Sequence, residues 1–135
     1  MRIGLLLVML ALVACGDDAP PAAATPTFAI DTNRITVSGV SSGAMMATQM
    51  HVALSGLVHG SAMIAGGPYY CAEGGLKKGL GPCMKGGDVG LSALVDYAKS
   101  SAASGAIDDI ANLSDDPVWL FSGKNDAVMH TDVTI

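Results

Sequence analysis

The chain has 135 residues, a formal net charge of −5 and 14% charged residues, and half of its residues are hydrophobic. This length suits one domain, and the hydrophobic content argues against a disordered chain. An acidic chain lacks the basic surface that binds phosphates, so the composition excludes a nucleic-acid-binding protein. We expect neither a metal site nor a cofactor, because the sequence contains no recurrent ligand spacing and no cofactor motif.

The N-terminus is typical of an export signal. Arg2 precedes an apolar run from Ile3 to Val13, which is shorter than the roughly 20 residues of a membrane-spanning helix. The run continues into the tetrapeptide LVAC, which ends at Cys15 and resembles a bacterial lipobox. We therefore expect a lipoprotein signal peptide over residues 1–14 and a lipid anchor on Cys15, which would attach the protein to a membrane. An ordinary cleaved signal with an incidental cysteine is the alternative.

The residues after Cys15 predict a tether and then a folded domain. Residues 16–27 are rich in Pro, Ala and Asp and have no apolar periodicity, so residues 15–27 are interpreted as the lipidated cysteine and a flexible tether. The domain is expected over residues 28–135. Gly16 favours placement of the anchored protein on the outer membrane, at its periplasmic or surface face; an extracellular location is the alternative.

The domain alternates predicted strands and helices, which indicates a parallel sheet and an α/β fold. The predicted strands cover residues 33–40, 58–65 and 117–122, and the predicted helices cover residues 44–54 and 89–104.

Each predicted helix carries an apolar stripe, and the second has Asp88 as its expected N-cap. The stripe residues are Met45, Met46, Met50, Ala53 and Leu57 in the first helix, and Leu91, Leu94, Val95 and Ala98 in the second.

Two cysteines, Cys71 and Cys83, lie in a glycine-rich excursion over residues 69–87. An even number of cysteines in an exported domain favours a disulfide, worth about 3 kcal/mol for a loop of this length. A free pair or a metal-binding pair is the alternative.

The sequence Gly39-Val40-Ser41-Ser42-Gly43 fits the G-x-S-x-G nucleophile elbow, placed between a predicted strand and a predicted helix. In this motif the two glycines allow a close approach of strand and helix around a strained serine. We therefore predict Ser41 as the nucleophile and the backbone N–H of Ser42 as an oxyanion donor. A glycine-rich turn without catalysis is the alternative.

The predicted triad acid is Asp126, because it follows the nucleophile in chain order and lies after a later strand. Asp115 and Asp116 precede that strand and are interpreted as turn or capping residues. The alternative for Asp126 is a turn aspartate with no catalytic role.

None of the histidines satisfies the requirements for the triad base. His51 lies inside a predicted helix and His59 at the start of a buried strand, so both are interpreted as structural. His130 follows Asp126 by only four residues, although the base must reach the serine and the acid from opposite sides. We therefore expect the triad histidine to be missing from the chain and the reading frame to be partial.

Four segments together resemble the extracellular poly(3-hydroxybutyrate) depolymerases and related esterases. The most specific of these segments is Ala65 to Ala72. The segments are VSGVSSGAMMA at 37–47, AGGPYYCA at 65–72, CM at 83–84 and WLFSG at 119–123 with Asp126.

The resemblance implies an incomplete α/β-hydrolase domain in circularly permuted form, which agrees with the early position of the serine strand. It implies Ser41 as nucleophile, Asp126 as acid and an acyl-serine mechanism on a polyester of 3-hydroxy acids. Tyr69 and Tyr70 are predicted to border the substrate groove; aromatic packing beside the cysteines is the alternative. Two other functions stay open, namely an esterase for small or plant-derived esters and a non-catalytic surface lipoprotein fragment.

Overall fold

The computed structural model describes residue 25 and residues 27–135, and its centre is a three-stranded parallel sheet in the order β1-β2-β3. The predicted signal peptide and Cys15 lie outside the described residues. The strands are β1 (Val37–Val40), β2 (Ser61–Ile64) and β3 (Val118–Phe121). Because all three strands run parallel, the predicted α/β architecture is confirmed.

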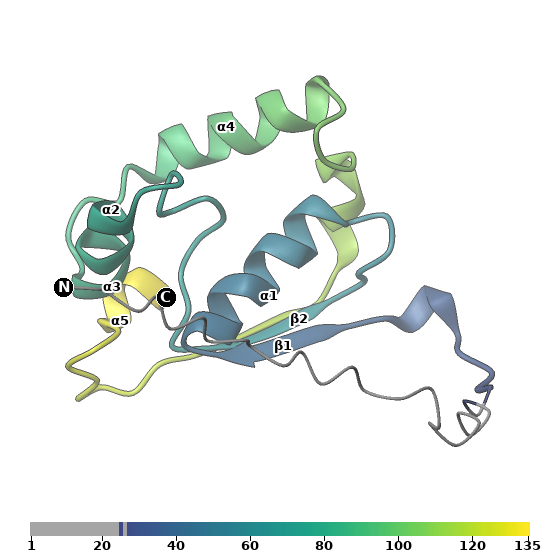
Figure 1. Ribbon diagram of the computed structural model, residues 1–135, viewed down its shortest axis with the longest axis horizontal. Helices are drawn as coiled ribbons and strands as arrows, with labels where there is room; N and C mark the ends of the chain where they lie inside the picture. Colours follow the sequence, from purple (N-terminus) through teal and green to yellow (C-terminus); the bar gives the residue numbers. More distant parts are fainter. Residues whose placement is uncertain (1–24, 26) are drawn as a thin grey trace, which may run out of the picture.

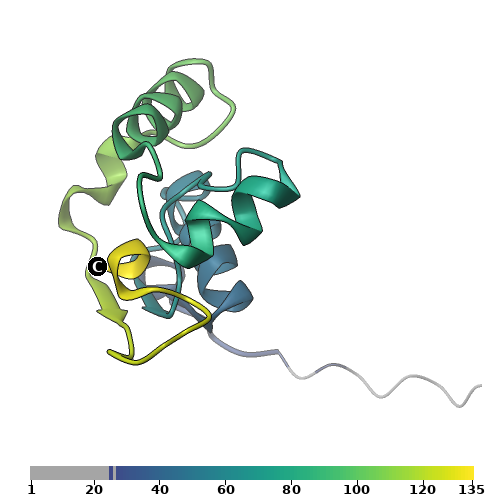
Figure 2. The same ribbon diagram turned by 90° about the vertical axis from the view of Figure 1, so that its left-hand side faces the viewer.

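Helix α1 (Ser42–Ala53) covers one face of this sheet, and the short helices α2 (Leu76–Leu80), α3 (Pro82–Lys85) and α5 (Thr131–Thr134) lie toward the carboxyl ends of its strands (Figure 1). Helix α4 (Leu91–Ala103) lies beyond α1, away from the sheet (Figures 1 and 2). The 3₁₀ helices are η1 (Thr32–Arg34) and η2 (Ile110–Asp115). No helix in residues 25 and 27–135 is long and apolar enough to cross a membrane.

The buried residues in the first half of α1 are small, which contradicts the predicted methionine stripe; only His51, further along, is larger. Ala44 and Ala47 pack on Met63 of β2, whereas Met46 and Met50 are 58% and 38% exposed. The helix approaches the sheet so closely that only short side chains fit between them. A Cβ atom on Gly66, for example, would lie 2.8 Å from the Cβ of Ala44.

The predicted strand at 33–40 is four residues shorter than expected. Its first part forms η1, which Asp31 caps by accepting the N–H of Asn33 at 3.0 Å. A capping side chain of this kind competes with strand pairing, and local hydrophobicity does not reveal the competition.

Helix α4 lies where it was predicted, but its cap and its buried face differ. The N-cap is Gly90, in the left-handed conformation, and Asp88 accepts the N–H of Gly90 at 2.7 Å. Of the predicted stripe only Leu94 is buried, whereas Leu91 and Val95 are 58% and 44% exposed.

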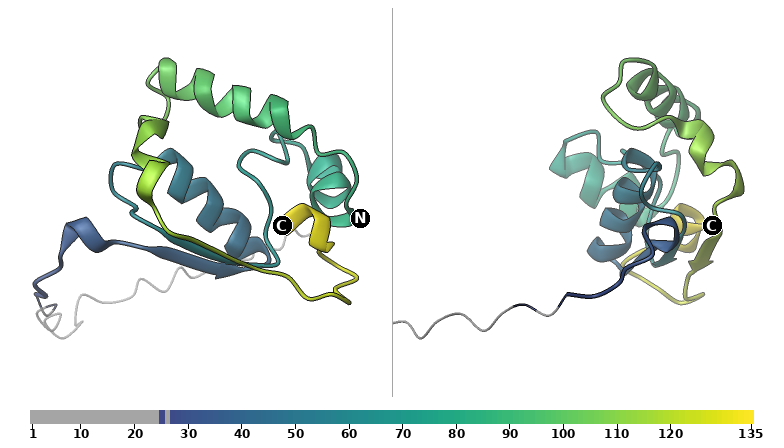
Figure 3. Two further views of the ribbon diagram at one scale, coloured as in Figure 1. Left: turned by 180° about the vertical axis from the view of Figure 1, so that it is seen from behind. Right: turned by 90° about the vertical axis from the view of Figure 1, so that its right-hand side faces the viewer.

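The face of the sheet opposite α1 is open along β1 and β3 (Figure 3). Side chains on alternate positions of these strands point to this face. Val40, Trp119 and Phe121 are each at least half exposed, and the rings of Trp119 and Phe121 stack 5.9 Å apart.

The glycine-rich excursion is closed by the predicted disulfide. Cys71 and Cys83 are bonded at an S–S distance of 2.07 Å, and both are buried against Leu94 of α4. The excursion also contains α2 and α3, which the sequence did not predict. The disulfide therefore closes the excursion on itself, and its packing against Leu94 places the excursion beneath α4.

Substitution of Gly39 by alanine should destabilise the fold severely. Its Cβ would lie 2.2 Å from the carbonyl carbon of Gly43, so β1 and α1 would have to move apart. We expect the free energy of unfolding to fall by about 3 kcal/mol or more, measured by urea denaturation.

Gly43→Ala is the matched control, because a Cβ there meets nothing within 4 Å. We expect this variant to be at least as stable as the parent, since alanine is the better helix former. Equal stability of the two variants would contradict the close contact at Gly39.

Candidate active site

Ser41 occupies the turn between β1 and α1 in a strained conformation. Its φ and ψ are 54° and −117°, a left-handed region that residues other than glycine rarely adopt. Its N–H donates to the carbonyl of Ile64 at 2.9 Å, and its carbonyl accepts the N–H of Met45 at 3.0 Å. The turn is therefore held from both sides, by the neighbouring strand and by the first turn of the helix.

The two glycines of the predicted elbow have different roles. Gly39 is required by the close approach to the backbone of Gly43, as the motif predicted. Gly43 is not required in this way, because a Cβ on it would lie in open space. The prediction that both glycines make room for the helix is thus correct for Gly39 and wrong for Gly43.

The side chain of Ser41 is exposed, although the residue occupies the N-cap position of α1. It makes no capping hydrogen bond, so its hydroxyl is available for chemistry. Ser42 is the first residue of α1, where the backbone N–H has no partner within the helix. That N–H and the positive end of the helix dipole both favour a negative charge developing near Ser41.

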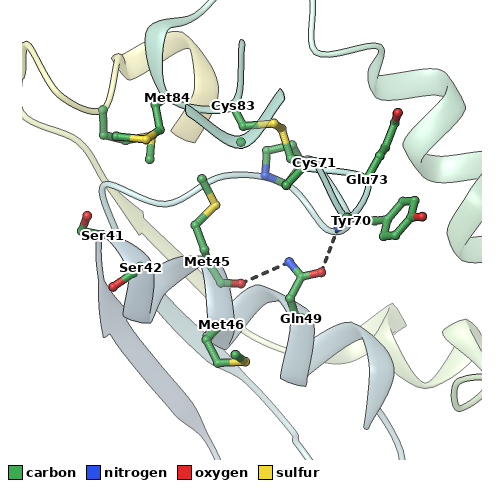
Figure 4. A pocket seen from close by; sticks show the side chains of 15 residues that line it. Ser41, Ser42, Met45, Met46, Gln49, Tyr70, Cys71, Glu73, Cys83 and Met84 are labelled. Carbon is green, nitrogen blue, oxygen red and sulfur yellow. Dashed lines mark hydrogen bonds between the residues drawn. A yellow bond between two sulfur atoms is a disulfide. The ribbon is translucent and has the colours of Figure 1, made fainter. Parts of the chain in front are cut away.

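A largely apolar pocket of about 480 Å³ opens beside Ser41 (Figure 4). One wall is α1, and the other is the excursion with its disulfide. The pocket is lined by Ser41, Ser42, Met45, Met46, Gln49, Pro68, Tyr70, Cys71, Ala72, Glu73, Gly74, Gly79, Cys83, Met84 and Met129. A concave apolar site with a few polar groups suits a small aliphatic ligand.

Asp126 lies in the loop after β3, at the same edge of the sheet as Ser41. Its Oδ1 accepts the N–H groups of Val128 and Met129 at 2.8 and 2.9 Å. These two bonds hold the pKa of the Asp126 carboxyl below its ordinary value, with smaller contributions from the nearby charges of His130 and Lys85. The carboxylate is therefore ionised at neutral pH. Within the described part of the chain its Oδ2 accepts no hydrogen bond, which suits a second partner such as an imidazole.

His51 is buried at the opposite, amino edge of the sheet. Its Nδ1 lies 2.8 Å from the Oγ of Ser61, and its Nε2 lies 2.9 Å from the Oδ2 of Asp116. Ser61 pairs with Val37 at the start of β1, whereas Ser41 follows the end of that strand. His51 thus joins α1, β2 and the segment before β3, and its predicted structural role agrees with these contacts.

The positions of the other two histidines follow from hydrogen bonds of their backbone N–H groups. The N–H of His59 donates to the carbonyl of Ile35 at 2.8 Å, which puts His59 at the amino edge with His51. The N–H of His130 donates to the carbonyl of Met84 at 2.8 Å, and His130 precedes α5 with an exposed side chain. Among the described residues, no histidine is hydrogen-bonded to Ser41 or Asp126.

Tyr69 and Tyr70 form one aromatic cluster with Tyr97 of α4. The ring of Tyr97 stacks 3.7 Å from that of Tyr70 and 6.4 Å from that of Tyr69. Tyr70 also lines the pocket, whereas Tyr69 lines a separate apolar cavity beneath α4. Tyr97 lies 27 positions beyond Tyr70. In the sequence it is only an aromatic residue on a predicted helix, and nothing there indicates its contact with Tyr70. Substrate binding by Tyr69 and Tyr70 stays a prediction.

Replacing His51 by alanine should destabilise the protein without creating or removing a nucleophile. The change leaves the carboxylate of Asp116 and the hydroxyl of Ser61 without their partner in a site that is mostly buried. We expect the free energy of unfolding to fall by about 3 kcal/mol, measured by urea denaturation near neutral pH.

Asp116→Asn is the companion variant, because its amide can still accept from the imidazole. It should lower the free energy of unfolding less than His51→Ala does. If His51→Ala were as stable as the unsubstituted chain, His51 would not hold α1, β2 and the segment before β3 together.

Comparison with known proteins gives two curated relatives of the whole chain. A poly(3-hydroxybutyrate) depolymerase of Delftia acidovorans is 43% identical over 126 residues, which cover 91% of this chain and 26% of the relative. A polyhydroxybutyrate depolymerase of Talaromyces funiculosus is 33% identical over 123 residues, which cover 90% of this chain and 35% of the relative. No protein-family model matches the chain.

Two solved structures have the same fold as this chain. The crystal structure of a PHB depolymerase from Penicillium funiculosum superposes with a TM-score of 0.71 at 32% identity and covers 80% of this chain and 33% of that one. A serine-to-alanine PHB depolymerase complexed with an R3HB trimer gives the same TM-score at 31% identity. The fold is therefore that of an α/β hydrolase, and the chain spans about a quarter to a third of the length of these relatives.

Proposed function

From its homology to the poly(3-hydroxybutyrate) depolymerases, we propose that this chain is the nucleophile-bearing part of a serine esterase that hydrolyses poly(3-hydroxybutyrate)-type polyester. The observation that carries the proposal is the strained, exposed Ser41 at the start of α1, beside an apolar pocket. Such a turn costs about 1–3 kcal/mol and persists where the surrounding structure holds it, which is typical of functional sites.

In the proposed reaction, the Oγ of Ser41 attacks the carbonyl carbon of the ester while a base removes its proton. The N–H of Ser42 donates to the oxyanion of the tetrahedral intermediate. The carbon–oxygen bond to the leaving alcohol then breaks, and the base returns the proton to that alcohol. Water attacks the acyl-serine in the same way, which releases the acid and restores Ser41.

Asp126 is proposed as the acid that orients the base, since within the described residues its Oδ2 accepts no hydrogen bond and its carboxyl pKa is lowered, which suits a charged partner for an imidazole. His51 and His59 lie at the wrong edge of the sheet for this role. The exposed His130 lies nearer, but among the described residues its ring is hydrogen-bonded to neither Ser41 nor Asp126. We therefore assign the base to a histidine of the longer, parent protein, outside these 135 residues.

The pocket supports an aliphatic ester as substrate. Its wall is formed mainly by methionine side chains and the disulfide, which can pack against short alkyl groups. An esterase for other small or plant-derived esters would use the same serine and acid, so turnover of the polymer against such esters distinguishes the two.

Reaction with a fluorophosphonate probe tests the proposed nucleophile. We expect the 135-residue chain to be labelled slowly and the parent protein with its histidine to be labelled at least about a hundredfold faster, since the base contributes on the order of 10²–10⁴. Mass spectrometry of the digested protein should place the label on Ser41, and Ser41→Ala should abolish it.

Ser114→Ala is the control, because Ser114 is an exposed serine far along the chain in η2. Labelling of the parent protein that persists in Ser41→Ala would refute Ser41 as nucleophile. A parent protein that reacts with neither probe nor polymer would favour the non-catalytic surface lipoprotein.

We also propose that the protein is exported and anchored by lipid on Cys15, on the strength of the lipobox-like tetrapeptide. In a bacterial host fed with labelled palmitate, the parent chain should incorporate label and sediment with membranes. Cys15→Ala should lose both properties, and a chain that stays membrane-bound without label would contradict the anchor.

A further inference from the structure

Gln49 is the polar side chain at the middle of the pocket wall, and both ends of its amide are used (Figure 4). Its Oε1 accepts the backbone N–H of Tyr70 at 2.9 Å, and its Nε2 donates to the carbonyl of Met45 at 3.1 Å. The orientation of the amide is unambiguous, because a backbone N–H needs an acceptor and a carbonyl needs a donor. Gln49 therefore joins α1 to the excursion on the other side of the pocket.

The residue that Gln49 holds is itself strained. Four non-glycine residues in the described part of the chain have positive φ, and three of them line this pocket. These three are Ser41 (φ 54°), Tyr70 (φ 57°) and Glu73 (φ 47°). A left-handed tyrosine persists only where other contacts determine its backbone, and here the acceptor of Gln49 and the stacking on Tyr97 supply them.

The amide of Gln49 has a second N–H in addition to the one given to Met45. Within residues 25 and 27–135, this second N–H has no acceptor. The lining also contains Met45, Met46 and the Cys71–Cys83 disulfide, which donate no hydrogen bond, and Glu73, whose carboxylate can only accept one. A ligand in the pocket that carries a carbonyl oxygen would therefore find a neutral donor at Gln49.

We propose that Gln49 is a substrate-binding residue, which holds Tyr70 in place through its oxygen and donates its second N–H to a carbonyl oxygen of a bound ester. The inference rests on the proposed function, because it takes the pocket beside Ser41 as the site of the ester. The ligand it predicts is an aliphatic ester with a further carbonyl beyond the one that Ser41 attacks. A polyester unit next to the scissile bond has this chemistry.

The experiment separates the two roles of Gln49 by two substitutions in a Ser41→Ala background, which prevents turnover. Gln49→Glu keeps an oxygen to accept the N–H of Tyr70 but has no N–H to donate, either to a ligand or to the carbonyl of Met45. Gln49→Leu is slightly smaller, is apolar and loses both functions. Met50→Leu is the control, since Met50 is the next residue of α1 and does not line the pocket.

Two quantities are measured, namely amide hydrogen exchange of Tyr70 and the dissociation constant of a methyl-ester trimer of 3-hydroxybutyrate from NMR titration. We expect Gln49→Glu to retain slow exchange at Tyr70 but to bind the trimer about three- to tenfold more weakly, the effect of one neutral hydrogen bond. Gln49→Leu should lose both slow exchange and binding, and Met50→Leu should change neither.

If Gln49→Glu binds the trimer as tightly as the chain with Gln49, Gln49 is not a donor to the ligand. Binding by the chain with Gln49 leaves the proposed function intact. Fast amide exchange at Tyr70 in the chain with Gln49 overturns the inference that Gln49 holds Tyr70 in place. A trimer that binds no form of the chain overturns the inference and also counts against the polyester function, an outcome distinct from the selective loss.

Discussion

The contact between Gly39 and the backbone of Gly43 is the constraint on which the site depends. A side chain at Gly39 would lie 2.2 Å from the carbonyl carbon of Gly43, so α1 can begin directly after β1 only if that position is glycine. The short connection holds Ser41 at φ 54°. Its hydroxyl makes no capping hydrogen bond and lies at the carboxyl ends of the strands. The same connection places the N–H of Ser42, which has no partner among the described residues, at the next position of the chain, near where an oxyanion would form.

The excursion forms the second wall of the pocket and contacts the loop that contains Asp126. Its Cys71–Cys83 disulfide packs against Leu94 of α4, and the N–H of Tyr70 donates to Gln49 of α1. At its far end, the carbonyl of Met84 accepts the N–H of His130, and Lys85 donates to the carbonyl of Ala127 at 3.1 Å. Because Ala127 and His130 both belong to the loop that follows β3 and contains Asp126, the excursion contacts both the nucleophile helix and the acid loop.

The two edges of the sheet show why hydrogen-bonded geometry alone does not define an active site. At the amino edge, Ser61, His51 and Asp116 form a serine–histidine–aspartate array with distances of 2.8 and 2.9 Å. That serine is buried in an ordinary strand, so the array fastens three elements together. At the carboxyl edge, Ser41 is strained, exposed and next to a cavity, although no histidine among the described residues contacts it. Access and backbone strain therefore distinguish the candidate nucleophile from the structural serine.

The features that depend on near neighbours could be predicted from the sequence: the alternation that builds a parallel sheet, the serine turn, the cysteine pair and the position of Asp126 after β3. The sequence did not show which face of α1 is buried. Hydrophobic periodicity detects that Met46 and Met50 are apolar, but it carries no information on the distance between the helix and the sheet. That distance follows from Gly39 and Gly66 and, beside these glycines, suits the small side chains of Ala44 and Ala47. Nor did it pair His51 with Asp116, or Gln49 with Tyr70, since these partners are 65 and 21 residues apart. Such contacts became visible only in the folded chain, because they form where separate elements meet and neither segment carries a periodic pattern that indicates them.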